Sequence, residues 1–386
     1  MIKGYKIRIY PTREQQDLIW KHFGASRFIW NYMLNMQEEN HANGGKFISA
    51  FGMHHLLTPL KKQEGFEWLT KISNGTLQCI CADLAEAYKH FFGGAGFPKY
   101  KSRKKAKPAY PIRCDEFYVL KGHAQIPKLG RVKYKSDFQF PEGRGHKFSD
   151  VRLSYKNGKY MLSFGIECEN QAPELHDYSM GIDLGIKDLA VVACGDEHIV
   201  FHNINKSKKI RDLKKKIRHV QRSISRKYEA SKKRNGGRYE KTANIIKEED
   251  KLSRLYARLS NIRENYIHQT THELVSMLPR EVIMEELNVM GMMKNRHLGK
   301  AVAEQCFYEF ARQMQYKCEW NGIPFTKVPR FYPSSKTCSC CGEIKHDLKL
   351  SDRTYVCPKC GLEIDRDYNA AINLMRYTDS QTGVVA

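Results

Sequence analysis

Apolar and polar side chains alternate along residues 1–10, "MIKGYKIRIY". Successive side chains of a strand point to opposite faces, so this pattern predicts a β-strand with one buried face. Alternation returns in "RVKYKS", "DVRLSY" and "KYMLSFGIEC", and "YKNGKY" carries the Asn-Gly signal of a tight hairpin. These stretches predict an all-β unit over about 109–170. If the first strand joins that unit, the residues between them form an insertion.

Apolar residues take a helical spacing across residues 11–97. Thr12 and Gln15 form a capping box, the signature of a helix start. We expect Gly24 to end this first helix and a second helix to follow it directly. A further helix is expected to begin near Thr76. This segment is therefore predicted to form a small helical module.

The pattern changes again from about residue 180. "MGIDLGIKDLAVVACGDEHIVFHN" predicts three strands, and a long helical hairpin follows, divided by "NGG" at 235–237 and ending near Met277. "REVIMEELNV" predicts a buried strand, residues 300–321 a helix, "PFTKVP" a fifth strand and "RDYNAAINLMRY" a last helix. The predicted order is βββ-α-β-α-β-α, with one module inserted before the last helix.

Positive charge changes this picture. The 386 residues include 65 Lys and Arg against 42 Asp and Glu, a net charge of +23, and a chain of this length predicts two to four domains. The charge is clustered in 97–108 and in 206–241, where 16 Lys and Arg stand against three acids. Such a field attracts polyanions, so nucleic acid is the predicted partner.

The sequence predicts no association with a membrane. No apolar run reaches the length that a membrane span requires, and the first residues lack the apolar core of a signal peptide. We therefore expect a cytoplasmic protein that associates with the nucleoid. Its twelve cysteines should then be reduced, and paired cysteines are interpreted as metal ligands.

Two cysteine pairs have the spacing of a metal site. Cys338 and Cys341 form one C-x2-C, Cys357 and Cys360 form another, and fifteen residues separate the pairs. A glycine follows each pair and permits a tight turn that directs two sulfurs at one ion. Four thiolates satisfy tetrahedral Zn²⁺ with no open position, so one structural zinc ion is predicted. Cys340, inside the first pair, could substitute for a ligand.

Three acids predict a second, different metal site. Asp183 lies on the first strand after residue 180, Glu285 ends an apolar strand and Asp367 opens the last helix. A lone acid is usually a surface residue, but the RNase H fold gathers three carboxylates from these elements. There they hold two Mg²⁺ ions ~4 Å apart, and carboxylate oxygens suit such hard cations. Asp365, just before the helix, is expected to be its N-cap.

These residues resemble a known family, the transposon-encoded RNA-guided nucleases called TnpB or OrfB, relatives of the type V CRISPR effectors. The resemblance spans almost the whole chain in the expected order. It is carried by "KIRIYPTREQ", "RFIWN", "FPKYKSRKK", "GIDLGI", "SKKRNGG", "IMEELNV", "PSSKTCSCCG" and "YVCPKCGLEIDRDYNAAINL".

The resemblance implies a multidomain α/β architecture. It implies a wedge β-barrel over 1–10 and 98–175, interrupted by a helical recognition module over 11–97. It also implies an RNase H-like (RuvC) nuclease domain over 176–330 and 363–386, which holds a zinc-ribbon insert over 331–362. The implied partners are a guide RNA from the transposon end and double-stranded target DNA, bound by a monomer in an RNA complex and cut next to a short flanking motif.

The resemblance also implies roles for particular residues. Asp183, Glu285 and Asp367 would hold two Mg²⁺ ions, although many relatives have Glu-Asp where this chain has Glu285-Glu286, which leaves Glu286 as an alternative ligand. The basic stretches are expected to contact phosphates independently of sequence. The predicted nucleic-acid contacts are Lys101, Arg103, Lys104, Lys214, Lys215, Lys216, Arg218, Arg353 and Arg366.

Three alternative functions share parts of this pattern. A nuclease-inactive RNA-guided repressor would share the basic features but needs none of the three acids. A transposase that joins strands itself, or an accessory transposase protein, lacks a recognisable Tyr or Ser nucleophile here. A plain zinc-ribbon nucleic-acid-binding protein would leave the acids at 183 and 285 unexplained.

Overall fold

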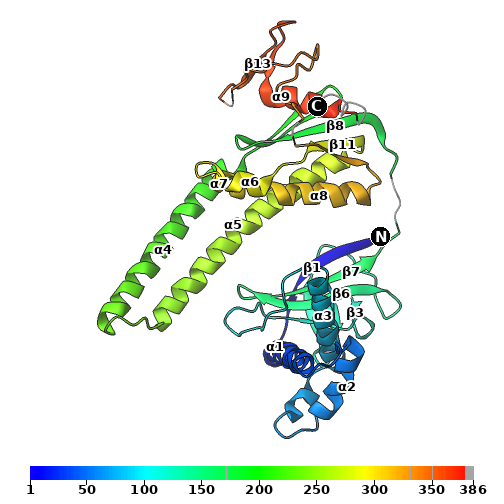
Figure 1. Cartoon of the computed structure of the whole chain (residues 1–386), viewed down its shortest axis with the longest axis vertical. Helices are drawn as coiled ribbons and strands as arrows, with labels where there is room; N and C mark the ends of the chain where they lie inside the picture. The colour runs from blue at the N-terminus through cyan, green and yellow to red at the C-terminus, as the bar shows by residue number, and fades with distance from the viewer. Residues whose placement is uncertain (170–172, 331, 350, 379–386) are drawn as a thin grey trace. The chain divides into compact units, whose positions relative to one another are not determined.

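We describe the protein from a computed structural model that defines residues 1–169, 173–330, 332–349 and 351–378. The chain divides into two compact units, residues 1–169 and 170–386 (Figure 1). The finer domain boundaries given above stay predictions. Residues 170–172, 331, 350 and 379–386, which fall within the predicted barrel, ribbon and nuclease segments, lie outside the described residues.

A seven-stranded antiparallel sheet forms the β part of residues 1–169, all of which the structure describes. Its order is β2-β6-β7-β1-β5-β4-β3, so the first strand of the chain lies in the middle, between β7 and β5. Closure of this sheet into a barrel stays a prediction. The strands are β1 (Ile2–Tyr10), β2 (Ala109–Pro111), β3 (Tyr118–Leu120), β4 (His123–Ile126), β5 (Gly130–Lys135), β6 (Phe148–Lys156) and β7 (Lys159–Glu167).

The predicted hairpin turn joins β6 to β7. Asn157 and Gly158 both have positive φ, 52° and 79°, as a two-residue hairpin turn requires. The segment between β1 and β2 is helical, so the helices are inserted into the chain of the sheet, as the pattern indicated. They are α1 (Arg13–Ala42), α2 (Ala50–Leu60), the 3₁₀ turn Glu67–Lys71 and α3 (Asn74–Phe92).

The predicted break at Gly24 is wrong. Helix α1 starts at the predicted capping box of Thr12 and Gln15 and continues through Gly24 to Ala42. A glycine inside a helix costs only about 1 kcal/mol, and both halves of α1 are held by packing. The first half contributes Ile19 to the core of the sheet, and the second half contributes residues such as Ile29 to a helical core shared with α2 and α3.

A mixed five-stranded sheet forms the centre of the second unit, within its described residues. Its order is β10-β9-β8-β11-β12; β8, β9 and β10 are antiparallel neighbours, and β11 runs parallel to both β8 and β12. The strands are β8 (His176–Leu184), β9 (Asp188–Cys194), β10 (Glu197–His202), β11 (Pro279–Glu285) and β12 (Phe325–Val328).

Helices cover both faces of this sheet (Figure 1). The predicted hairpin is α4 (Lys208–Arg234) and α5 (Ala243–Ser276), a long antiparallel pair that extends away from the sheet. Between β11 and β12 lie α6 (Val289–Met293), α7 (Gly299–Gln305) and α8 (Phe307–Trp320). The last helix is α9 (Arg366–Met375), and a small ribbon with β13 (Thr354–Val356) and β14 (Glu363–Asp365) precedes it. The observed order of elements matches the predicted βββ-α-β-α-β-α.

The helix expected over 300–321 is two helices. Cys306 has a φ of 56°, a left-handed conformation that a right-handed helix cannot contain, and it separates α7 from α8. No helix among the described residues combines the length and the apolar character that a membrane span needs.

Candidate functional site

Strand alternation assigns the two faces of the second sheet to different partners. Met180, Ile182 and Met284 belong to a core shared with residues of α5 and α8. Ile283 and Ala193 belong to the clusters that contain the buried residues of α9. Odd-numbered residues of β8 and β11 therefore face α9, and even-numbered residues face α5 and α8.

This alternation puts Asp183 and Glu285 on the α9 face. Strands β8 and β11 are parallel neighbours whose paired register ends with Met284 opposite Ile182, and the two acids are the next residues on the two strands. Both acids are half-buried. Each acid thus lies at or next to the last residue of its strand, on the face covered by the helix that carries Asp367.

Helix α9 begins as predicted. The Asp365 carboxylate accepts hydrogen bonds from the N–H groups of Asp367 (2.9 Å) and Tyr368 (3.1 Å), and is therefore the N-cap. Asp367 lies in the first turn. The buried residues Ala371 and Leu374 follow it at the spacing of one helix face, so the helix presents that face to the sheet.

Gly181 allows α9 to lie directly on β8. A Cβ at this position would stand 2.1 Å from the carbonyl oxygen of Ala371 and 2.3 Å from the backbone nitrogen of Met375. No side chain can occupy that space, because both obstacles are backbone atoms. Sequence analysis did not assign a role to Gly181, although it is the first residue of the "GIDLGI" motif.

The three acids interact electrostatically. Burial, followed by repulsion from Asp367 and Glu285, raises the pKa of Asp183 well above its usual value. Burial raises the pKa of Glu285 to about 7. A cluster that disfavours its own ionised form is stabilised by a cation, so the chemistry of this donor set fits a hard divalent metal.

Two arginines lie against the third acid. The Arg366 guanidinium contacts the Oδ1 atom of Asp367 through Nε (3.1 Å) and one terminal nitrogen (2.8 Å), and both side chains are 14% exposed. Arg353 lies 3.9 Å from Oδ2 of the same carboxylate. Both were predicted to contact nucleic acid. The structure gives each a carboxylate partner beside the acid cluster, and contact with nucleic acid stays a prediction.

Glu285 and the adjacent Glu286 have different surroundings in the structure. Glu286 is exposed, and its carboxylate pairs with Arg330 at 2.9 Å. Glu285 is the residue at the end of β11 that faces α9. The geometry therefore favours Glu285 as the partner of Asp183.

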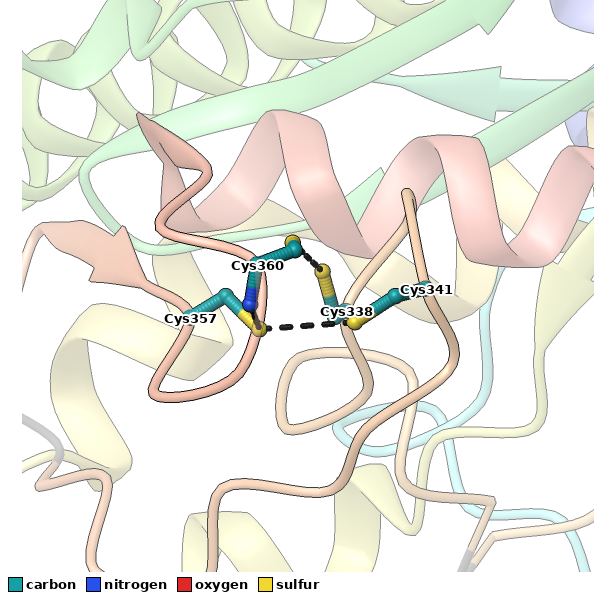
Figure 2. A group of neighbouring side chains, drawn as sticks. All are labelled: Cys338, Cys341, Cys357 and Cys360. Carbon is teal, nitrogen blue, oxygen red and sulfur yellow. Dashed lines mark hydrogen bonds between the residues drawn. The ribbon is translucent and has the colours of Figure 1, made fainter.

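The four predicted cysteines form the second cluster. The sulfur atoms of Cys338, Cys341, Cys357 and Cys360 all lie within 4.8 Å of one another, which makes these residues a candidate metal site. The sulfurs converge from two loops (Figure 2). The Sγ atoms of Cys341 and Cys357 are 3.5 Å apart, and those of Cys338 and Cys360 are 3.6 Å apart. Cys340 is exposed and is not a member of this cluster.

The loops that carry the cysteines have the predicted turns. Gly342 and Gly361 have positive φ, 76° and 74°, and each donates its N–H to the carbonyl of the first cysteine of its pair. The backbone N–H of Cys360 and that of Lys359 lower the pKa of Cys357 to about 6. That thiol is therefore largely a thiolate near neutral pH, the form that binds metal.

Two buried asparagines of α9 join the ribbon to the acid cluster. Asn369 donates to the carbonyl of Thr337 (2.7 Å) and accepts from the N–H of Ser339 (3.0 Å). Asn373 donates to the carbonyls of Ser334 (2.8 Å) and Thr337 (2.7 Å). Sequence analysis missed these residues; their spacing of four in "DYNAAIN" was the available signal.

The apolar residues of the basic hairpin are buried between its two helices. Ile210, Leu213 and Ile217 of α4 pack with Leu259 of α5, which leaves Lys215, Lys216 and Arg218 exposed. Further along α4 a shallow groove is lined by Arg218, His219, Gln221, Arg222, Ser225 and Arg226. Lys214 differs from its neighbours, because its ammonium forms a 2.7 Å ion pair with Glu304 in a half-buried position.

The basic segment predicted over 97–108 belongs to the first unit. The Lys101 ammonium lies over the Trp30 ring, 3.3 Å from the centroid, and the Lys101 N–H is bonded to the Asn31 side chain. Arg103 and Lys104 are exposed. Nucleic-acid contact by these residues stays a prediction.

Comparison with known families matches three parts of the chain. The model described as "Cas12f1-like, TNB domain" matches residues 307–374, "Probable transposase" (OrfB of IS605 elements) matches 163–296, and a "Helix-turn-helix domain" model from the same group matches 1–46. In the structure the last of these ranges holds β1 and the uninterrupted helix α1.

Curated relatives match over nearly the full length. A candidate RNA-guided DNA endonuclease of Escherichia coli, InsQ, is 29% identical over 97% of this chain and 92% of its own. A protein of Streptomyces pristinaespiralis with the same description is 28% identical over 97% and 88%. A TnpB-like protein of Acanthamoeba polyphaga mimivirus is 24% identical over 97% and 73%. These family models and full-length relatives together support the TnpB (OrfB) family, which is related to the type V CRISPR effectors.

Solved structures with a similar course of the chain are more distant. A Cas12f1–sgRNA–target DNA complex is 17% identical over 97% of this chain and 99% of its own, with a TM-score of 0.38. The mini-RNA-guided endonuclease CRISPR-Cas_phi3 is 12% identical over 97% and 92%, with a TM-score of 0.48.

Proposed function

We propose that this protein is an RNA-guided DNA endonuclease of a transposable element. The observation that carries the proposal is the convergence of Asp183, Glu285 and Asp367 at one end of the second sheet, from β8, β11 and α9. The names of the full-length relatives support it. In this proposal the second unit is an RNase H-like (RuvC) nuclease domain, and the sheet of the first unit is a wedge barrel.

The three carboxylates would hold two Mg²⁺ ions. Bound there, the ions would activate a water and stabilise the leaving oxygen of a phosphodiester. The chain's own contribution is to fix the oxygens. The pairing of β8 with β11 up to Ile182 and Met284 would position Asp183 and Glu285, which follow directly. The close contact of α9 with Gly181 would fix the distance of α9 from the sheet, and the Asp365 cap fixes the helix start.

Arg366 and Arg353 have a defined place in this proposal. The Arg366 guanidinium offsets part of the negative charge, since it lowers the pKa of Asp183 against the repulsion of the other acids, and Arg353 lies 3.9 Å from the Asp367 carboxylate. With metal present, the same guanidinium groups lie beside the site and can pair with phosphate oxygens.

The cysteine cluster would hold one structural Zn²⁺. Four thiolates leave no open coordination position, so this ion supplies folding energy and no chemistry. The apolar core of the ribbon is small: Cys338, Tyr355 and Cys357 are buried, with Leu348, Leu362 and Ile364 packed against them. A core of this size requires a metal to be stable.

The nucleic-acid partners would be a guide RNA from the transposon end and double-stranded target DNA. Base pairing would select the sequence, and the protein would contact phosphates and a short flanking motif. The exposed face of α4 and the basic residues at 101–104 are the proposed backbone contacts, in a monomer that acts in the cytoplasm. Neutralising Lys215, Lys216 and Arg218 together should flatten the dependence of RNA affinity on salt, and an unchanged slope would refute this role.

The decisive experiment begins with the protein and the RNA that copurifies with it. The RNA is sequenced, and the complex is incubated with Mg²⁺ and plasmids that carry the matching target next to randomised flanks. Glu285→Gln and Glu286→Gln form a matched pair of adjacent acids. The proposal predicts cleavage next to one flank by the wild type and Glu286→Gln, and none by Glu285→Gln. Guided binding without cleavage by the wild type would instead identify a repressor.

A further inference from the structure

The turn between β8 and β9 lies two residues after Asp183. This segment, the 185–187 turn, is held by side chains and not only by the sheet. The Gln305 Nε2 atom donates to the carbonyls of Gly185 (2.8 Å) and Ile186 (3.2 Å). Gln305 is 3% exposed, so these bonds are shielded from water and their loss would leave buried polar groups unpaired.

Other side chains complete this arrangement. Asn203 donates to the Ile186 carbonyl (2.8 Å), and the Lys206 ammonium donates to the Lys187 carbonyl (2.8 Å). Each carbonyl of the 185–187 turn therefore accepts at least one side-chain hydrogen bond. A turn whose consecutive carbonyls are all bound cannot rotate its peptide planes without breaking several of these bonds.

The orientation of the Gln305 amide is itself determined. Its Oε1 atom accepts from Asn205 Nδ2 (3.4 Å), which leaves the Nε2 group to face the turn. Asn205 is buried, and its own Oδ1 accepts from Arg263 Nε at 2.7 Å. Cys306 follows Gln305 directly and ends α7 with its left-handed backbone conformation. The amide therefore lies in a fixed frame of backbone and side chains.

The neighbouring residue joins this frame to the basic hairpin. Glu304 pairs with Lys214 of α4 (2.7 Å) and Arg263 of α5 (3.6 Å), and its carbonyl accepts from Asn205 (2.9 Å). The three side chains of these ion pairs are each between 17% and 28% exposed. Both hairpin helices are thus joined, through Lys214 and Arg263, to the residue that precedes Gln305.

We propose that Gln305 is a positioning residue for Asp183. By holding the carbonyls of Gly185 and Ile186, it fixes the end of β8 and so the direction of the Asp183 carboxylate, which the repulsion of the other acids would otherwise displace. A divalent ion requires its oxygen ligands to be placed within tenths of an ångström. This inference rests on the proposed function, since it assumes that Asp183 binds metal.

Mn²⁺ is a suitable probe, because free Mn²⁺ is measured directly by electron paramagnetic resonance. The full-length protein, with any copurified RNA, is titrated with Mn²⁺, and the binding that Asp183→Asn removes is taken as the signal. Gln305→Met keeps the size of the side chain but removes the donor. We expect it to weaken this Asp183-dependent binding by on the order of 10-fold.

Gln313→Met is the matched control. Gln313 is also a buried glutamine of the same unit, but its partners are Thr271 and Glu309, and it does not contact the 185–187 turn. Its substitution should lower the unfolding temperature comparably and leave Mn²⁺ affinity within about twofold of wild type. Equal affinity for Gln305→Met and Gln313→Met would refute the positioning role. If Asp183→Asn removes no Mn²⁺ binding, the proposed metal site itself is refuted.

Discussion

The cysteine cluster and the acid cluster meet at α9, yet they are assembled differently. The four cysteines lie between positions 338 and 360, and their sulfurs gather within 4.8 Å through two local turns. The acids lie at positions 183, 285 and 367, on two parallel neighbouring strands and on α9, the helix that packs on the same face of the sheet. The first cluster depends on local backbone conformation, and the second depends on the packing of the whole unit.

The chemistry of the two clusters differs in the same way. Backbone N–H groups stabilise the charged form of Cys357, so one cysteine of the cluster is in the metal-binding form without any metal, whereas the pKa of Cys341 and that of Cys360 are raised. Burial acts against the charged forms of Asp183 and Glu285, and repulsion from the other acids adds to its effect at Asp183. A structural site can therefore be organised by short-range bonds, whereas a site for hard cations must be held by the fold against its own charge.

The largest effect is expected from the acids themselves. Asp183→Asn and Asp367→Asn should each lower cleavage by on the order of 10³-fold or more, because a neutral amide replaces a charged metal ligand. RNA binding should survive, as measured by filter binding. Asp365→Asn is the control, since asparagine is an equally good N-cap. It should still cut, and a dead Asp365→Asn beside an active Asp367→Asn would reverse the assignment.

Gly181→Ala should damage the acid cluster and spare the cysteine cluster. The new Cβ would meet the backbone of Ala371 and Met375, so α9 must shift, at a cost of about 1–3 kcal/mol or more in unfolding free energy. Thermal unfolding and zinc content measure the two clusters separately.

Gly24→Ala is the matched glycine substitution. A Cβ there meets nothing within 4 Å, and the residue lies inside α1, so the protein should become more stable by up to about 1 kcal/mol. Loss of zinc in Gly181→Ala would show that the two clusters depend on each other more than the local bonding of the ribbon implies.

Cys357→Ser should have the converse effect. We expect elemental analysis to find one zinc per wild-type chain and none in the variant, with the ribbon becoming sensitive to protease while most of the chain stays folded. Cys340→Ser is the control, because that exposed side chain lies outside the cluster. Wild-type protein purified without chelator that contains no zinc would contradict this assignment.

The smallest effect concerns pH. The folded-state pKa of Glu285 is about 7, above its ordinary value of 4.5, so between these values the folded state keeps a proton that the unfolded chain has lost. The stability of metal-free protein should therefore fall as pH rises from 4.5 to 7, and this group should cause no further loss above 7. Glu285→Gln should reduce that slope, as measured by unfolding temperature in chelator, and an unchanged slope would argue against the buried position of Glu285.

Much of the candidate site could be predicted from the chain. Cysteine spacing with a glycine after each pair predicted a cluster that the structure contains, since the geometry of a C-x2-C turn is local. Asp183 and Glu285 could be recognised as acids in strands that are otherwise apolar. The N-cap at Asp365 predicted where α9 begins and so which of its residues face the sheet. The misplaced helix break at Gly24 has a physical cause as well: one glycine costs less than the packing of a helix with buried residues on both sides of it.

Three features were decided by tertiary structure alone. Gly181 matters because a helix nearly two hundred residues later presses on it, and no local pattern records that contact. The asparagines at 369 and 373 and the glutamine at 305 look like ordinary polar residues until the carbonyls they bind are known. By itself the sequence determined which elements form and which residue types can bind metal, because propensity, spacing and capping act over a few residues. The faces that meet, and the buried polar groups that must then be paired, followed only from long-range packing.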